Sequence, residues 1–395
     1  MFEQLSRFQP GMAQQISSQI EGGTFSQVSL FGGERYSLRL SFGLETIRAL
    51  SCTEGGRDLC SCESCRKFAN LAVSNVVIVS QRDHVSIIET NLATFSRLAN
   101  DFSRNLVIRS IRTLLLQYHP ALFGGTLTAT QNTLSDAASN LNEQLLELAN
   151  KRDVEVKEAK KISDELRTSL KSLYAASRKS STISINQVRS LSEWTSQTSM
   201  GDGKRFIIIE ALEDTNTSAR NSLLKMLEEP AKDTYFFLIS EYPGRIMQTI
   251  LSRVRRYAFP PLTESALAAY LQPYYLGDRH YDSLELFYLE SGGMDVKKSR
   301  ELAHRLSESV VYHRQLGSAE LSALIQEVDQ MQSQELLFKT LLEEFHQALL
   351  AKVITLDRMQ RFSQLLNTTS SNAKLFNQNA KLTLESLYYR LMEER

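Results

Sequence analysis

The sequence predicts an α/β core of parallel strands, with all-α regions inserted into it and following it. Two unbroken apolar runs, Phe206–Ile209 and Tyr235–Ile239, have the composition of strands that are buried on both faces of a parallel sheet. The stretch Ser218–Glu229 between them lacks Gly and Pro, repeats leucines along one helical face and stops before Pro230. Strand, helix and strand in this order are typical of a parallel βαβ unit.

Length and composition limit the classes of protein to consider. A chain of 395 residues predicts two or three domains, and a hydrophobic content of 42% is enough for their cores. Lys plus Arg (45) equals Asp plus Glu (45), so any DNA contact must come from a local patch or from an assembly. We find no signal-like N-terminal segment and no apolar run of roughly eighteen residues, and therefore expect a cytoplasmic protein without a membrane contact.

The same alternation of strands and helices occurs in the first part of the chain. Its apolar patterns predict a helix over 12–22, a strand over Gln27–Phe31, a helix ending at Leu50 and another strand over Asn75–Val79. After the strand at Tyr235–Ile239, a Pro-Gly turn leads into a short helix that ends near residues 252–253. These elements predict a sheet of several parallel strands.

All four cysteines of the chain lie in one short window. Cys52, Cys60, Cys62 and Cys65 can close a tetrahedral structural zinc site, and clustered cysteines in a cytosolic protein favour a metal over disulfides. One residue, Ser61, separates the second cysteine from the third, and such close spacing strains binding by both. A weaker or three-ligand site, or four reduced thiols without metal, remain alternatives. We do not expect a catalytic zinc, because no nearby His or carboxylate completes an open coordination site.

A long helical segment, at about 84–180, interrupts the α/β pattern. Residues 94–116 have a helical pattern, and 132–176 repeat leucines at helical spacing. The leucines of the second stretch are Leu141, Leu145, Leu148, Leu166, Leu170 and Leu173. The segment predicts an inserted helical hairpin or arm. It is either a docking surface for a partner or DNA, or a solvated embellishment, and the sequence does not separate these alternatives.

Three strings in the second half of the chain carry a family resemblance. They are LLKMLEEP at 223–230, YFFLIS at 235–240 and ILSRVRRYAFPPL at 250–262. Together they resemble the bacterial DNA polymerase clamp-loader subunits of the AAA+ class. The resemblance resumes at 183–189, so the insertion interrupts the core domain and does not end it. It implies an AAA+ P-loop-type core over 1–260, a small helical lid over 261–307 and a helical collar over 308–395 through which subunits form a ring.

The resemblance also marks where a phosphate-binding loop would lie, directly after the first strand. Such a loop needs glycines to wrap the phosphates, a lysine for the terminal phosphates and a hydroxyl for magnesium. Gly33 is in place, but Tyr36 and Leu38 occupy positions where the family has glycines. Arg39 replaces the lysine, and Leu40 replaces the residue with the hydroxyl. We therefore expect no ordinary Mg·ATP binding by this chain.

Other nucleotide-site positions of the family are also altered. By resemblance, Glu210 stands for the magnesium-binding Asp and Ala211 for the catalytic Glu, so no general base remains. Asp295 stands where active relatives have a phosphate-sensing Arg. By contrast, Ser252 and Arg253 are retained, and the resemblance implies that Arg253 is an arginine finger that reaches the ATP site of a neighbouring subunit in trans.

The resemblance therefore implies a non-hydrolysing clamp-loader subunit of DNA polymerase III. As a ring scaffold it would supply Arg253, bind structural zinc and no ATP, and help to load the sliding clamp on primer–template DNA. Its implied partners are gamma/tau and delta subunits in a hetero-pentameric ring, in a bacterial cytoplasm and at the nucleoid during replication. The alternative is an ATP-hydrolysing gamma/tau-like subunit with a divergent phosphate loop. A free-standing zinc-containing DNA-binding protein is disfavoured by the neutral net charge.

Overall fold

The computed structural model describes residues 1–124, 128–179, 183–197, 203–274, 280–375 and 378–394. Two compact units, Met1–Gly292 and Gly293–Arg395, make up the chain. The predicted boundaries at 260 and 307 stay predictions. Within the described ranges, no helix is long and apolar enough to span a bilayer.

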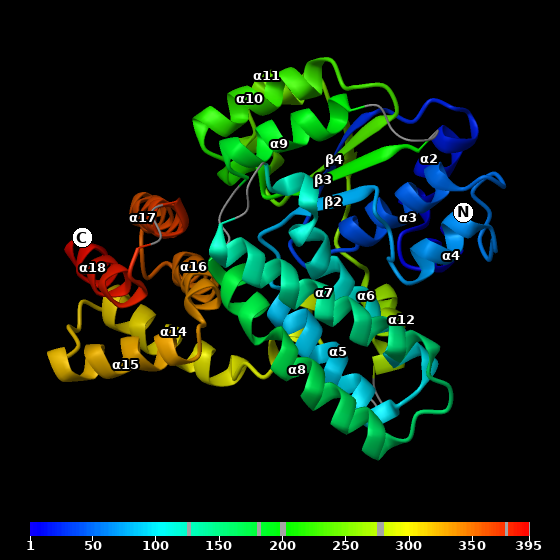
Figure 1. The fold of residues 1–395 in the computed structure, drawn as a ribbon. Helices are drawn as coiled ribbons and strands as arrows, with labels where there is room; N and C mark the ends of the chain where they lie inside the picture. The colour runs from blue at the N-terminus through cyan, green and yellow to red at the C-terminus, as the bar shows by residue number, and fades with distance from the viewer. Residues whose placement is uncertain (125–127, 180–182, 198–202, 275–279, 376–377, 395) are drawn as a thin grey trace. The chain divides into compact units, whose positions relative to one another are not determined.

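A five-stranded parallel sheet lies at the centre of the first unit, in the order β2-β3-β4-β1-β5 (Figure 1). The strands are β1 (Val28–Gly32), β2 (Val76–Val79), β3 (Arg205–Glu210), β4 (Thr234–Ser240) and β5 (Arg255–Ala258). The four apolar runs of the sequence are β1 to β4, which confirms the predicted α/β core. The edge strand β5 was not predicted, because its two arginines face solvent and only Tyr257 is buried.

Helices cover both faces of this sheet, since alternate side chains of its strands belong to two separate apolar clusters. One layer consists of α1 (Glu3–Ser6), α2 (Pro10–Glu21), α3 (Arg39–Ser51), α4 (Glu63–Ala69), α12 (Glu264–Leu271), η5 (Gln272–Tyr274) and α13 (Leu284–Ser291). The other consists of α9 (Ile185–Ser196), α10 (Thr217–Glu228) and α11 (Gln248–Leu251). Short turns η2 (Pro120–Leu122), η3 (Leu212–Asp214) and η4 (Pro243–Arg245) complete the layers. This architecture fits the AAA+ fold.

The register brings three strand ends to one edge of the sheet. Gly32 at the end of β1 lies beside Ser240 at the end of β4, and Glu210 at the end of β3 lies beside Ile239 of β4. Open α/β sheets place their ligand sites at the carboxyl ends of the strands. The loop after β1 and the acid at the end of β3 therefore share the edge where a nucleotide site would be.

The inserted segment is a packed four-helix bundle, whereas the sequence predicted a hairpin or arm. Its helices are α5 (His84–Leu98), α6 (Asp101–Leu115), α7 (Ala129–Asn150) and α8 (Val156–Lys179), with η1 (Leu116–Tyr118) after α6. All six predicted leucines of α7 and α8 are buried in one cluster with apolar residues of α5 and α6. The difference arises because α5 and α6 supply the facing half of this core. Residue 180 lies outside the described residues.

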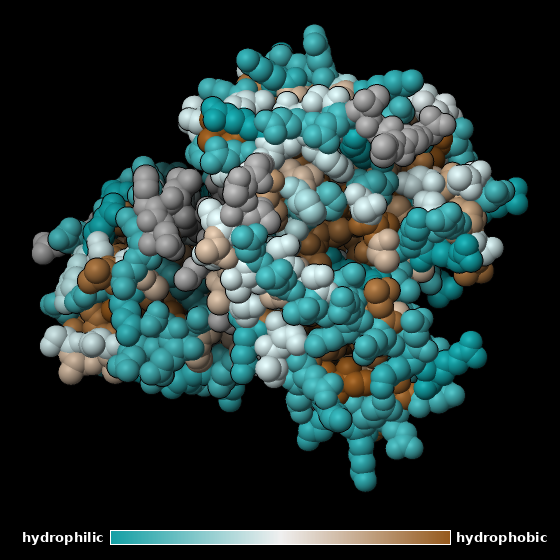
Figure 2. Space-filling model, in the orientation of Figure 1, coloured by the Kyte–Doolittle hydropathy of each residue, from teal (hydrophilic) through white to brown (hydrophobic). Residues whose placement is uncertain are grey.

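The outer surface of the bundle is largely hydrophilic over α7 and α8 (Figure 2), where Lys157, Lys160 and Lys161 are exposed. On the inner side, α5 contacts α13, where the Thr90 hydroxyl lies 3.3 Å from the carbonyl oxygen of Tyr288. The bundle is therefore anchored to the α/β core through a helix that follows the core in sequence.

The second unit is all-α, as predicted for the end of the chain. It contains α14 (Val296–Val311), α15 (Ser318–Gln330), α16 (Gln334–Leu350), α17 (Leu356–Leu375) and α18 (Ala380–Glu393) around one apolar cluster. The buried guanidinium of Arg358 donates to the carbonyl oxygens of Val310 (2.8 Å) and Val311 (3.2 Å), and so satisfies the last turn of α14. Of the predicted lid, α12 and α13 belong to the first unit and α14 to the second.

Candidate functional site

The loop between β1 and α3 stands where a phosphate-binding loop would lie, and it is closed by its own residues. Gly33 is required there, because a Cβ at this position would lie 2.7 Å from the carbonyl oxygen of Phe259. The side chains of Tyr36, Leu38 and Leu40 are all buried in the apolar cluster under the loop. The loop therefore keeps its course, while the groups that would face a phosphate are apolar or turned inward.

Arg39, in place of the phosphate-loop lysine, is 3% exposed and is bound by the protein itself. Its guanidinium donates to the carbonyl oxygen of Ser240 at the end of β4 and, at 3.3 Å, to that of Arg35, while Nε donates to the Ser37 hydroxyl at 2.8 Å. Burial lowers the pKa of Arg39, although nearby Glu210 opposes the change. These contacts use the arginine to join the loop to β4.

Tyr36 fills a second part of the same site. Its hydroxyl donates to the Asp83 carboxylate at 3.0 Å, and its ring stacks on Tyr288 of α13 with 5.8 Å between centroids. Asp83 in turn caps α5 by accepting the backbone N–H of Ser86. One residue of the degenerate loop thus links the sheet edge to two helices.

Glu210, at the position of the magnesium-binding acid, forms a nearly buried ion pair with Arg82. The two side chains are 9% and 17% exposed, and Arg82 Nη2 lies 2.6 Å from a carboxylate oxygen. Burial opposes ionisation of the carboxyl, but the Arg82 charge and hydrogen bonds from Arg82 and Ser80 outweigh it and lower the pKa of Glu210 to about 2. The carboxylate charge is therefore already compensated by a protein cation.

Ala211, in place of the catalytic acid, has a methyl group and no proton acceptor in its side chain. Its backbone is left-handed, with φ at 54°, and its N–H donates to the carbonyl oxygen of Ile239 at 3.0 Å. It follows Glu210 directly at the end of β3. The side chain cannot activate water.

His84 was not predicted as a site residue, because none of the six histidines has ligand spacing in the sequence. It is 3% exposed at the start of α5, and its Nε2 lies 2.5 Å from the Gln117 side-chain amide. Burial and the Arg82 charge lower the pKa of His84 to about 4, against smaller opposing effects of Glu210 and Asp83. A buried neutral histidine next to an ion pair leaves no periodic signal in the sequence.

The pKa of His84 predicts a pH dependence of folding. The unfolded chain binds a proton at His84 near pH 6.5 and the folded chain only near pH 4, so stability is intact above pH 6.5 and falls as the pH drops toward 4. The expected loss is about 3 kcal/mol. Urea unfolding at a series of pH values should show this slope, and His84→Gln should flatten it. His280→Gln, at an exposed site, should not; equal slopes in all three proteins would disprove the assignment.

Arg253 follows α11 and lies at the surface of the first unit, with its side chain 37% exposed. One guanidinium nitrogen lies 2.8 Å from the carboxylate of Glu228 at the end of α10, and another donates to the carbonyl oxygen of Thr249 at 2.5 Å and to the Ser252 hydroxyl at 3.3 Å. The predicted pair Ser252 and Arg253 is thus in contact. The guanidinium is therefore partly exposed and is bound by the exposed acid Glu228 and by two groups of its own turn.

Asp295, the position matched to the phosphate sensor, caps α14 in the second unit. Its carboxylate accepts the backbone N–H of Lys298 at 2.9 Å. This capping contact is a sufficient local reason for an acid at the start of the helix.

The four cysteines of the predicted zinc site come together within the first unit. Their sulfur atoms all lie within 4.8 Å of one another, with Cys52 Sγ at 3.6 Å from Cys60 Sγ and 3.9 Å from Cys62 Sγ. A tetrahedron with zinc–sulfur bonds of about 2.3 Å has sulfur–sulfur edges of about 3.8 Å. The arrangement therefore fits a tetrahedral metal ion, and the single residue between Cys60 and Cys62 does not keep their thiols apart.

Backbone geometry explains how the short spacing is accommodated. Cys62 is the N-cap of α4, so its sulfur accepts the N–H of Cys65 at 3.5 Å, and the Cys60 sulfur accepts the N–H of Cys62 at 3.5 Å. The N–H groups of Cys65 and Thr53 lower the pKa of the Cys62 thiol to about 6. A thiolate at neutral pH is the form that binds zinc.

Zinc removal is expected to destabilise the first unit. The purified protein should contain one zinc per chain, and chelation should lower its Tm, because the loop 52–65 has little apolar core besides Cys65. Metal analysis and differential scanning calorimetry before and after chelation measure both effects. A metal-free chain with an unchanged Tm after zinc addition would favour the alternative of four reduced thiols.

Comparisons with known proteins point to one class. The model of the family described as "DNA polymerase III, delta subunit" matches residues 117–263. The DNA polymerase III subunit delta' of Pseudomonas aeruginosa is 36% identical over 118 residues, which are 30% of this chain and 36% of that protein. That of Bacillus subtilis is 42% identical over 81 residues, 20% of this chain and 25% of that protein.

A solved structure of a DNA polymerase III gamma subunit-related protein from Thermotoga maritima is also similar. The two sequences are 19% identical, and the matched region covers 54% of this chain and 80% of the solved chain. The TM-score is 0.27, so the match adds nothing to the fold described above.

The first unit combines an AAA+-type parallel sheet with a four-cysteine cluster, and the segment that matches the family model, 117–263, includes strands β3, β4 and β5. The relatives that this part of the chain resembles are DNA polymerase III delta' subunits. The chain spans between 25% and 36% of the length of the two relatives named above. What the whole chain does is therefore inferred below from its own residues.

Proposed function

We propose that this chain is a non-hydrolysing, delta-prime-type subunit of a DNA polymerase III clamp loader. The observation that carries the proposal is the closed nucleotide edge of the sheet. Arg39 is bound to the end of β4, Tyr36 to α5 and α13, and Glu210 to Arg82. Each side chain at which a nucleotide or its magnesium would bind is engaged by another group of the same chain. Such a subunit serves as a fixed member of the ring.

The second part of the proposal is that Arg253 acts on a neighbouring subunit. A guanidinium that approaches the γ-phosphate of bound ATP stabilises the charge that develops during hydrolysis. The exposure of Arg253 supports this role, since its ion pair with Glu228 is exposed and contributes about 1 kcal/mol or less, and its hydrogen bonds to Thr249 and Ser252 are also at the surface. The neighbour would carry the phosphate loop, the magnesium ligand and the general base that this chain lacks.

The assembly and location follow from this role. We propose gamma/tau and delta subunits as partners in a hetero-pentameric ring that loads the sliding clamp on primer–template DNA, in the bacterial cytoplasm and at the nucleoid during replication. The four cysteines would hold a structural zinc ion, and no ATP would bind to this chain. The neutral net charge agrees with DNA contact through the assembly rather than through a basic field of this subunit.

Reconstitution tests the proposal. This chain should form a stable complex with the clamp-loader ATPase and delta subunits of its own organism, and clamp loading should require it. Clamp loading by the other subunits alone at the same rate would refute the proposal. ATP hydrolysis by the isolated chain would instead support the gamma/tau-like alternative.

A further inference from the structure

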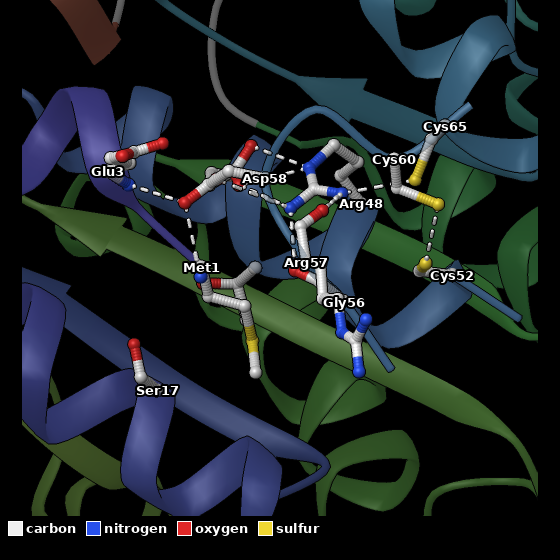
Figure 3. Close-up of polar contacts among 12 residues, drawn as sticks. Met1, Glu3, Ser17, Arg48, Cys52, Gly56, Arg57, Asp58, Cys60 and Cys65 are labelled. Atoms are coloured by element: carbon white, nitrogen blue, oxygen red, sulfur yellow. Dashed lines mark hydrogen bonds and ion pairs between the residues drawn. The ribbon is translucent and has the colours of Figure 1, made fainter. Parts of the chain in front are cut away.

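Arg48 of α3 reaches the four-cysteine cluster from the α/β core. Its side chain is 13% exposed, and Nη1 lies 3.1 Å from Cys65 Sγ (Figure 3). Cys65 is the one fully buried cysteine of the four. The guanidinium therefore meets the sulfur that solvent can stabilise least.

The same guanidinium also holds the loop that carries the first two cysteines. It donates to the carbonyl oxygens of Gly56 (2.9 Å) and Arg57 (3.1 Å), which lie between Cys52 and Cys60. Backbone carbonyls that turn toward one point need an unusual chain course, and Gly55 and Gly56 supply it with φ values of 73° each. One side chain thus fixes the loop to α3.

Two carboxylates fix the guanidinium in turn. Glu45, one turn earlier on α3, accepts from Nε at 3.0 Å and from Nη2 at 2.7 Å. Asp58 lies 3.8 Å from Nη2 and accepts the backbone N–H of Glu3 at 2.9 Å. Because Glu45 holds Nε and Nη2, Nη1 stays directed at the carbonyl oxygen of Arg57 and at the Cys65 sulfur.

The net charge of a zinc-loaded four-cysteine site explains why a cation lies beside it. Four thiolates and one Zn²⁺ carry a net charge of about −2 by the usual ligand charges. A partly buried anion of this kind is stabilised by a cation that donates a hydrogen bond to one of its sulfurs. Arg48 supplies such a hydrogen bond at the ligand that is most buried, and its charge is shared between this sulfur and the carboxylates of Glu45 and Asp58.

We propose that Arg48 is a positioning residue for the zinc site, which clamps the loop 52–60 and stabilises Cys65 as a thiolate ligand. The inference rests on the assignment of zinc to the four cysteines. Partners that hold metal ligands in place typically change metal affinity by about 10- to 100-fold when they are removed.

The test compares Arg48→Met, Arg48→Lys and Arg57→Met in the full chain. Arg57 belongs to the same loop, but its side chain is exposed, so the control removes an equal charge without the contact to sulfur. Zinc affinity is measured by competition with a chromogenic chelator. We expect zinc to bind about 10-fold more weakly to Arg48→Met, with Arg48→Lys in between and Arg57→Met close to the unchanged chain.

Cobalt-substituted protein gives a readout that a loss of packing alone would not move. Loss of the hydrogen bond to Cys65 Sγ raises the energy of the sulfur lone pairs, so the sulfur-to-cobalt charge-transfer band should shift to longer wavelength in Arg48→Met and by less in Arg48→Lys, whose ammonium can still donate. Parent-like affinity and an unshifted band in Arg48→Met would overturn the proposal; if that variant failed to fold, the same result in Arg48→Gln, which lacks the charge, would overturn it. A parent chain that binds neither metal would overturn the zinc assignment itself, which is a different result.

Discussion

Arg253→Ala is expected to leave this chain folded and assembled and to slow ATP hydrolysis at the one neighbouring site that it serves by about 10³-fold. Folding should be unaffected, because the ion pair of Arg253 with Glu228 is exposed and contributes about 1 kcal/mol or less. The ATP turnover of the whole complex should fall by the fraction of total hydrolysis that this one site contributes. Steady-state ATPase assays of the reconstituted complex, with sliding clamp and primer–template DNA, measure the change.

Arg255→Ala provides the matched control for this experiment. Arg255 is an exposed arginine on the adjoining edge strand β5, so its removal changes the local charge equally. Full turnover is expected with this variant. If both variants hydrolysed ATP as fast as the parent complex, Arg253 would not be the finger; if both were equally slow, the effect would be one of surface charge.

Arg82→Met is expected to destabilise the first unit by about 3–5 kcal/mol, because it leaves the Glu210 carboxylate buried without its cation. The pair is nearly buried and joined by two hydrogen bonds, so water cannot replace the lost partner. Urea unfolding at pH 7 measures the loss. In the same assay, Arg305→Ala, which breaks the exposed pair with Glu320, should cost about 1 kcal/mol or less.

The double variant Arg82→Met with Glu210→Leu separates the ion pair from its surroundings. With both charges gone, no buried ion is left unpaired, and the loss should be smaller than for Arg82→Met alone. An equal or larger loss would mean that packing around Arg82, and not compensation of Glu210, explains its place in the loop after β2.

The sequence was sufficient to predict the elements that depend on local pattern. Strands β2, β3 and β4 have uninterrupted apolar centres and β1 is buried along its length because helices cover both faces of the sheet, and this burial is visible in the sequence. Strand β5 escaped prediction because an edge strand that contacts one neighbour can expose two arginines. Burial therefore decided which strands could be found.

The substitutions in the phosphate loop were also visible in the sequence, but the contacts that the substituted side chains make were not. Arg39 binds Ser240, which is 201 positions away, and Tyr36 stacks on a residue of α13. No spacing rule connects residues at such separations. The same holds for His84, whose pKa is set by burial and by Arg82 rather than by any neighbour that a motif would include.

The four cysteines and the insertion show the same limit. The short spacing of Cys60 and Cys62 predicted strain, whereas the start of α4 turns both sulfurs to one point with backbone N–H groups as partners. The leucine pattern of α7 and α8 predicted helices, but not that their apolar faces meet α5 and α6. Deleting residues 132–176 would expose this core, so the insertion is no removable arm.

Direct titration of the isolated chain with a fluorescent ATP analogue and magnesium tests the central claim that its nucleotide site is closed. The engaged side chains of Arg39, Tyr36 and Glu210 predict no saturable binding at concentrations that saturate a clamp-loader ATPase subunit. Saturable, magnesium-dependent binding followed by hydrolysis would contradict the account and identify the chain as an ATPase subunit with a divergent loop.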